Sequence, residues 1–216
     1  MVTAWSLRAA PCPPCTCYSP DQSRKRGGFA RGGEPTWRLV SVIVLRPLVR
    51  ALIRSKWDGR ENIPRTGGVL LAANHMSYLD WAPDGAFLHA CGRYPVFMIK
   101  ASAFEVKGIG GFLRKAGQLP AHCGKDAALA LSEAENRLAA GAAVVIYPER
   151  TATRDPARWP MGARTGVARL ALATGVPVIP VAHRGTQDIL PYGEKKPRLL
   201  PRKTVHVLAG PPVDLS

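Results

Sequence analysis

Short apolar runs alternate with helix-forming stretches after Pro64, and this order limits the fold more than any other feature of the sequence. Helical character is strongest over residues 126–140 and 164–174, and a glycine that favours a helix end follows each stretch. The runs with the length and the Val, Ile and Leu content of strands are residues 69–73, 96–99, 143–147, 176–182 and 204–208. Such alternation is typical of α/β domains. We therefore expect one α/β domain over residues 61–216, with a mixed, largely parallel sheet flanked by helices and preceded by an amphipathic N-terminal helical segment.

Residues 1–35 have a different composition, rich in Pro, Gly, Ser and basic residues and without hydrophobic periodicity. We interpret them as a disordered basic leader, for which an over-long start of the reading frame is the simplest explanation. Cys12, Cys15 and Cys17 would supply only part of a structural zinc site, and no second half follows nearby. We therefore expect no bound metal.

Residues 36–60 predict a basic amphipathic helical segment. Arg46, Arg50 and Arg54 recur every four residues, and aliphatic residues form a stripe beside them: Val40, Val44, Leu45, Leu48, Val49, Leu52 and Ile53. Pro47 would either kink this helix or begin a second one. The segment either lies in an anionic membrane surface with its arginines among the headgroups, or packs its stripe on the core with a solvated basic face. The pattern alone does not separate these interpretations.

The charge of the chain indicates an anionic partner. Lys and Arg total 30 against 15 Asp and Glu, a formal net charge of +15. Nucleic-acid binding would require aromatic residues interleaved with the basic ones, and aromatic residues are a scattered 7%. We therefore expect no nucleic-acid partner. No apolar stretch approaches the roughly 18–20 residues of a spanning helix, and the five cysteines do not suggest a disulfide framework, which favours a reducing cytoplasm.

His75 and Asp80 are the strongest candidates for chemistry. His75 follows the apolar run 69–73, and α/β folds place reactive side chains just past strand ends. A carboxylate five residues later can orient the imidazole and stabilise its protonated form, so that the pair could deprotonate a substrate hydroxyl. Alone, this spacing more often belongs to a structural histidine than to a catalytic one. We interpret the other histidines as structural residues without a carboxylate partner: His89, His122, His183 and His206, the last of which occupies an expected strand.

Residues 74–80, Asn-His-Met-Ser-Tyr-Leu-Asp, resemble the NHxSxxD signature of the 1-acylglycerol-3-phosphate acyltransferase family of glycerolipid acyltransferases. Three further blocks follow in the family's order. Residues 111–120 resemble its second block, residues 145–151 resemble the block usually written FPEGTR, and residues 176–181 resemble its proline-punctuated strand. The resemblance extends over residues 37–216.

This resemblance implies that His75 is the general base on a glycerol hydroxyl and that Asp80 orients it. The resulting alkoxide would attack the thioester of acyl-CoA or acyl-carrier protein without an acyl-enzyme intermediate, and no cofactor is implied. Glu149 and Thr151 would lie near the phosphate and glycerol of the acceptor, with Glu149 positioning a cationic or hydroxyl group. The further candidates for substrate binding are Asn74, Ser77, Lys100, Arg114, Arg150 and Arg154.

Three positions depart from the family's pattern. Cys123 and Ala152 stand where arginines are expected, and Arg150 replaces the glycine after Glu149. If that glycine provides a positive φ, arginine costs about 1 kcal/mol or more and fills the acceptor pocket. Alternatively, Arg150 supplies a phosphate-binding charge that the other two positions lack.

The expected function is acyl transfer to lysophosphatidic acid, giving phosphatidic acid, at the cytoplasmic face of an anionic membrane to which the protein binds peripherally. The same chemistry on another lysophospholipid or a glycolipid is an alternative. So is a catalytically impaired protein that retains only lipid binding.

Overall fold

The computed structural model describes residues 35–122, 127–194 and 196–215. The leader with its cysteines and the position of Cys123 lie outside these residues. The helices are α1 (Pro35–Leu52), α2 (Trp81–Ala90), α3 (Ile109–Lys115), α4 (Ala127–Ala139) and α5 (Gly166–Thr174), with short 3-10 turns η2 (Arg60–Asn62), η3 (Ala101–Phe104) and η5 (Thr186–Asp188). The strands are β1 (Ile53–Asp58), β2 (Val69–Ala73), β3 (Pro95–Lys100), β4 (Leu119–Ala121), β5 (Ala143–Ile146), β6 (Val178–Arg184) and β7 (Lys203–Ala209).

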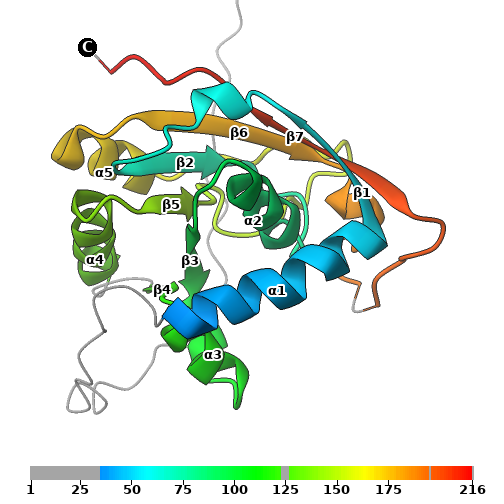
Figure 1. Ribbon diagram of the computed structural model, residues 1–216. Coiled ribbons are helices and arrows are strands. Elements are labelled where there is room, and N and C mark those ends of the chain that lie inside the picture. Colours follow the sequence, from blue (N-terminus) through cyan, green and yellow to red (C-terminus); the bar gives the residue numbers. More distant parts are fainter. Residues whose placement is uncertain (1–34, 123–126, 195, 216) are drawn as a thin grey trace, which may run out of the picture.

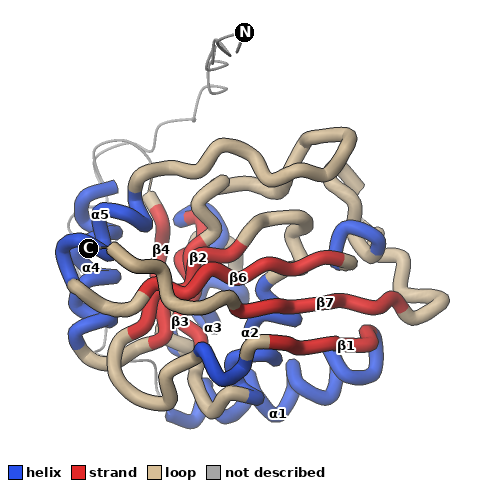
Figure 2. The backbone as a smooth tube through the Cα atoms, turned by 90° about the horizontal axis from the view of Figure 1, so that it is seen from above, coloured by secondary structure: helices blue, strands red, loops and turns tan. Residues whose placement is uncertain are grey.

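The seven strands form one sheet in the order β1-β7-β6-β2-β5-β3-β4. All neighbouring pairs are parallel except β6 and β7, which are antiparallel. The expected α/β fold with a mixed, largely parallel sheet is therefore confirmed. Figure 2 shows β7 and β1 side by side along one edge of this sheet, with α4 and α5 gathered at the other end of the molecule.

Both faces of the central strands are covered, because successive side chains point to opposite faces. On one face the core joins strand residues to α1 and α2: Leu71, Val145 and Ile179 with Val49 and Phe87. On the other face the next residues along the same strands pack with α4 and α5: Leu70, Val144 and Val178 with Leu138 and Leu170. Continuous apolar strands such as β2 are typical of parallel sheets buried on both faces.

The buried guanidinium of Arg93 fastens the loops that enter two central strands. It donates hydrogen bonds to the carbonyl oxygens of Pro64 (2.5 Å), Gly67 (2.7 Å) and Gly141 (2.9 Å). These carbonyls belong to the turns before β2 and β5, so one cation fixes where both strands begin.

The helix expected over residues 36–60 is wrong beyond Leu52. Ile53–Asp58 is strand β1, which pairs in parallel with β7. Ile53, Ser55 and Trp57 are more buried than the residue that follows each of them, and this period of two belongs to a strand. Arg54 therefore lies on a strand and does not continue the row of arginines along α1.

Helix α1 leaves much of its apolar stripe exposed. Side chains that are between 42% and 61% exposed define the α1 stripe: Leu39, Val40, Ile43, Val44 and Leu48. Among the side chains that the structure describes, Val49 and Leu52 at the end of the helix pack on the core, together with Ile53 that follows. The stripe predicted from the sequence is therefore divided, with its last residues buried and Val40, Val44 and Leu48 exposed. None of the helices in the described ranges is long and apolar enough to cross a bilayer.

Basic residues of α1 instead lie against the body of the domain. The guanidinium of Arg38 lies 4.8 Å from the ring centroid of Tyr94, and the positive charge of Arg46 acts on His89 of α2. Figure 1 shows α1 running alongside α2 and above α3.

Candidate active site

The loop of residues 74–80, between β2 and α2, lies at the carboxyl end of the central strands. The strands on either side of β2, which are β5 and β6, run parallel to it and end at the same edge. In α/β sheets this edge carries the reactive side chains. Motif blocks that are distant in the sequence meet here, and the backbone N–H of His75 donates to Glu149 Oε1, 74 positions later, at 2.9 Å.

His75 and Asp80 form the contact that the sequence predicts. His75 Nδ1 lies 2.8 Å from Asp80 Oδ2, and the side chain of His75 is 14% exposed while that of Asp80 is 0% exposed. With Nδ1 held by the carboxylate, Nε2 is the ring nitrogen that can take a proton from a substrate. The pair thus has the geometry of a general base and its orienting carboxylate.

The loop is folded around the Asp80 carboxylate. Asp80 Oδ2 accepts hydrogen bonds from the backbone N–H groups of Met76 (2.6 Å) and Ser77 (2.9 Å). Burial raises the pKa of Asp80, but its contacts with His183 and His75 outweigh burial and hold that pKa well below its ordinary value. The carboxylate therefore stays charged at neutral pH.

A second buried histidine contacts the same carboxylate. His183, on β6, places Nε2 3.0 Å from Asp80 Oδ2 and Nδ1 3.4 Å from Asp84 Oδ1. Neither ring nitrogen has the directed geometry of a hydrogen bond, so we describe both contacts as ion pairs. Burial lowers the pKa of His183, but the charge of Asp84 and contacts with Asp80 reverse this effect and raise the pKa to about 10.

Tyr147 joins this buried cluster to the reactive imidazole. Its ring stacks on that of His75 at a centroid distance of 4.5 Å and an angle of 21°, and its hydroxyl donates to Asp84 Oδ2 at 2.8 Å. Burial and the negative charge of Asp84 raise the pKa of Tyr147 well above its ordinary value, so the phenol remains a donor.

Glu149 ties two loops of the site together. Its Oε1 accepts from the backbone N–H of His75 and its Oε2 from the backbone N–H of Met161, both at 2.9 Å. Glu149 thereby fastens the loop of residues 74–80, called the reactive loop below, to the loop after β5. Each carboxylate oxygen keeps a second lone pair, so the positioning of a cationic or hydroxyl group by Glu149 stays a prediction.

The polar atoms of Asn74 and Ser77 bond to backbone groups. The Asn74 carboxamide donates to His183 O at 3.1 Å and accepts from His183 N at 2.8 Å, which joins the end of β2 to β6. Ser77 is fully buried, and its hydroxyl donates to Leu190 O at 2.8 Å. Both residues shape the loop, and their contact with substrate stays a prediction.

Arg150 adopts the backbone conformation that favours glycine. Its φ is 65°, in the left-handed region, and its side chain is exposed. The suggestion that this position requires a positive φ is thus confirmed. Thr151 follows it, half-buried, on the same loop.

Exposed aromatic residues lead from the reactive imidazole to Arg154. The ring of His75 meets that of Tyr78 edge-on at 6.1 Å, and Tyr78 lies 6.1 Å from Tyr192. The Arg154 guanidinium lies 5.3 Å from the centroid of Tyr192. Arg154 therefore belongs to the rim of the site.

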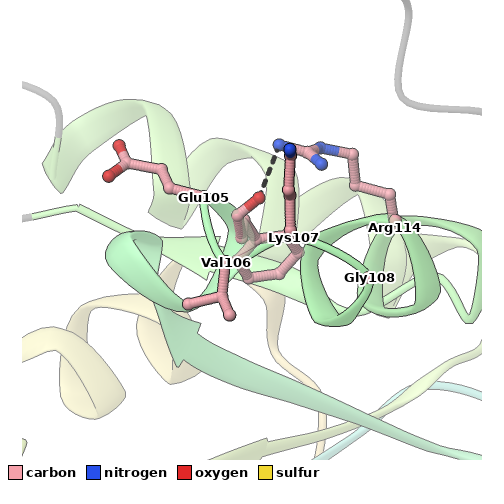
Figure 3. Close-up of a pocket in the computed structure, with 7 residues that line it drawn as sticks. Glu105, Val106, Lys107, Gly108 and Arg114 are labelled. Carbon is pink, nitrogen blue, oxygen red and sulfur yellow. Dashed lines mark hydrogen bonds between the residues drawn. The ribbon is translucent and has the colours of Figure 1, made fainter.

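Arg114 lies in a separate surface pocket (Figure 3). Its guanidinium donates to Phe104 O at 2.8 Å, beside Lys107, and the described residues that line this pocket do not include His75 or Asp80. Lys100 is exposed at the end of β3. Binding of substrate by either cation stays a prediction.

The interpretation of His183 as a histidine without a carboxylate partner is wrong. Its partners, Asp80 and Asp84, lie far away in the sequence, so local spacing does not find them. Two signals were present: His183 shares the buried parity of Ile179 and Val181 on β6, and Asp84 follows Asp80 by one helical turn. Within the described ranges, no cluster of three or more His, Cys, Asp or Glu side chains is arranged to hold a metal ion.

Comparison with known proteins gives relatives of two kinds. The chain is 29% identical over 164 residues to an uncharacterised protein of Mycobacterium leprae, covering 68% of this chain and 42% of that protein. It is 28% identical over 141 residues to the chloroplastic 1-acyl-sn-glycerol-3-phosphate acyltransferase BAT2 of Brassica napus, covering 64% of this chain and 39% of the relative. The chain thus spans about two fifths of the length of these curated relatives.

The fold matches a solved structure, that of the 1-acyl-sn-glycerophosphate acyltransferase PlsC from Thermotoga maritima. The TM-score is 0.65 at 24% identity, covering 82% of this chain and 70% of PlsC. The family model described as Acyltransferase matches residues 54–184, which include β1 from Arg54 onward, the reactive loop, the loop after β5 and His183. Because this match extends over more than half of the chain, the protein belongs to the Acyltransferase family.

Proposed function

We propose that this acyltransferase moves a fatty acyl group from acyl-CoA or acyl-carrier protein to the free hydroxyl of lysophosphatidic acid, forming phosphatidic acid. The observation that carries the proposal is the 2.8 Å contact between His75 and the buried Asp80 at the carboxyl end of β2. The names of the relatives in Brassica napus and Thermotoga maritima support the choice of acceptor.

In this proposal, His75 Nε2 takes the proton of the acceptor hydroxyl while the oxygen attacks the thioester carbonyl carbon. The C–S bond then breaks, and the proton on His75 passes to the departing thiolate. Asp80 fixes the tautomer and stabilises the imidazolium between these two steps. The stacked ring of Tyr147 limits rotation of the imidazole.

The charge at the rim of the site supports an anionic acceptor. Arg150 and Arg154 are both exposed on the loop after β5, which Glu149 ties to the reactive loop. A guanidinium is a strong donor to phosphate oxygens, and it can bind two of them at once. We therefore assign the acceptor phosphate to this loop.

The test is thiol release from palmitoyl-CoA in the presence of lysophosphatidic acid. We expect turnover that His75→Ala abolishes and Asp80→Asn lowers by about a hundredfold or more. Lysophosphatidylcholine serves as the acceptor control, since it carries a phosphate with an added cation. Turnover with that acceptor but not with lysophosphatidic acid would contradict the proposed substrate.

We also propose that the α1 stripe docks on an anionic membrane surface. Its five aliphatic side chains, each roughly half exposed, would gain on the order of 1 kcal/mol apiece on burial in lipid. Arg50 is exposed on the same helix and can reach anionic headgroups. Peripheral docking would bring the site to its lipid acceptor.

Sedimentation with vesicles containing phosphatidylglycerol tests the docking. Ile43→Asp in the stripe should reduce binding about tenfold or more, because a carboxylate on the lipid side opposes both insertion and the anionic headgroups. Leu172→Asp is the matched control, since Leu172 is an exposed apolar residue on α5. Equal losses in the two variants would contradict docking through α1.

A further inference from the structure

We propose that His183 is a positioning residue for acyl transfer. As a charged imidazolium held between Asp80 and Asp84, it keeps the Asp80 carboxylate ionised and aimed at His75. The inference rests on the proposed roles of His75 and Asp80, and adds a residue to which neither the motif blocks nor the mechanism above assigns a part.

The geometry gives His183 two carboxylate neighbours and a fixed backbone. Its side chain is 0% exposed, and those of Asp80 and Asp84 are 0% and 2% exposed. The carboxamide of Asn74 forms hydrogen bonds with both the N–H and the carbonyl of His183. The imidazole therefore has one location, between the two carboxylates, and no access to solvent.

The charges of this cluster require a cation. Two buried carboxylates this close to one imidazole would disfavour each other's ionisation if no positive charge lay between them. The groups that face His183 come from each element packed around it: Asp80 and His75 of the reactive loop, Asp84 of α2 and Tyr147 after β5, with Thr186 of η5 also contacting Asp80. His183 is the member of this set that can be cationic before the reaction starts, while Nε2 of His75 is still free to accept a proton.

The charge of His183 also acts on the base. His75 Nδ1 and His183 Nε2 contact the same oxygen, Asp80 Oδ2, so the two nitrogens are at most about 6 Å apart. Removing the positive charge makes the cluster bind a further proton more readily. A proton on His75 or on Asp80 disables general-base catalysis. Without the charge of His183, activity would therefore already be lost at a higher pH than in wild type.

Three variants separate this electrostatic role from packing. His183→Gln removes the cation, Asp84→Asn removes one carboxylate, and the double variant restores the original net charge of the cluster. In the pH dependence of kcat/KM, the acid limb is the range over which activity falls as the pH is lowered. We expect this limb to move to higher pH by about one to two units in His183→Gln and to lower pH in Asp84→Asn. In the double variant the limb should return toward its wild-type position. At pH values below the displaced limb, His183→Gln should lose about tenfold in kcat/KM per pH unit.

These results have clear alternatives. A purely structural role for His183 would lower kcat in the single and double variants alike and leave the acid limb in place, which would overturn the proposal. If His183→Gln does not fold, a downward shift in Asp84→Asn supports the proposal, and an unmoved limb contradicts it. KM for the acceptor should be unchanged in all three variants, since neither His183 nor Asp84 has a side chain exposed to substrate.

A second measurement does not depend on the substrate. Nitrogen-15 NMR of the wild-type protein labelled at its five histidines should show His183 protonated at pH 8, with Asp84→Asn lowering the pH at which it titrates. A neutral His183 at pH 8 would overturn the inference even if the enzyme is active. A charged His183 in a protein without turnover on lysophosphatidic acid would instead point to a wrong acceptor.

Discussion

Backbone strain beside the site can be tested at Arg150, because this residue occupies a left-handed backbone conformation with a φ of 65°. This conformation costs a residue with a Cβ about 1–2 kcal/mol, and glycine avoids that cost. Arg150→Gly removes both the strain and the side chain, whereas Arg150→Ala removes the side chain alone. We expect the glycine variant to have a free energy of unfolding about 1 kcal/mol higher than the alanine variant.

Urea unfolding of the two variants measures this difference, provided that both have the same m-value. Arg158, with a φ of 63°, gives an internal check, since Arg158→Gly should exceed Arg158→Ala by a similar amount. Equal stability of Arg150→Gly and Arg150→Ala would refute the strain at this position. The comparison of Arg150→Ala with wild type then reports what the guanidinium itself contributes.

Kinetics of the same variants decide between the two roles of Arg150. Its side chain is exposed, so we expect it to contact the acceptor phosphate and not to block the site. Arg150→Gly should then raise KM for lysophosphatidic acid a few-fold with kcat unchanged, in line with about 1 kcal/mol or less for an exposed ion pair. Turnover that appears only in Arg150→Gly would show instead that arginine obstructs the acceptor.

Three further predictions concern stability. Arg93→Gln should lower the free energy of unfolding by about 3 kcal/mol in urea titrations, because three backbone carbonyls lose a charged donor. Gly110→Ala should lower it by about 2 kcal/mol or more, since a Cβ there would lie 1.9 Å from Phe104 O, while Gly111→Ala, with open space, should stay within about 0.5 kcal/mol of wild type. Because the pKa of His183 is raised, its positive charge stabilises the fold fully below about pH 6.5, and this stabilisation is lost as the pH rises toward 10. Thermal melts should therefore show a smaller decrease in Tm at alkaline pH in His183→Gln than in wild type.

The part of the site that could be predicted from the sequence is the part formed by residues close together in the chain. Only Asn74 separates His75 from the end of β2, and Asp80 is near enough in the chain for the loop to bring the two together. The apolar run of β2 and the glycines after α4 and α5 also determine structure within a few residues, since they favour a strand and two helix ends. Because these features are encoded within a few residues, their structural outcome could be read without knowledge of the whole fold.

Partners from distant segments could not be read in this way. His183 meets Asp80 only because β6 pairs with β2 in one particular register, in which Ala73 lies opposite Val181. The sequence gives the buried parity of His183 but not its neighbour in the sheet. The same limit applies to Glu149, whose carboxylate accepts two backbone amides that only the folded loops bring near.

Helix α1 shows why amphipathic patterning alone does not determine which face is buried. The pattern gives two faces, and which one packs inward depends on the surface that the rest of the chain presents. Here that surface offers the ring of Tyr94 to the guanidinium of Arg38, and the charge of Arg46 acts on α2, while Val49 and Leu52 of the same helix pack on the core. The α1 stripe stays outside, where water disfavours it and lipid would not. This exposed aliphatic surface is therefore itself an argument for an apolar partner, and the contrast between Ile43→Asp and Leu172→Asp measures whether that partner is a membrane.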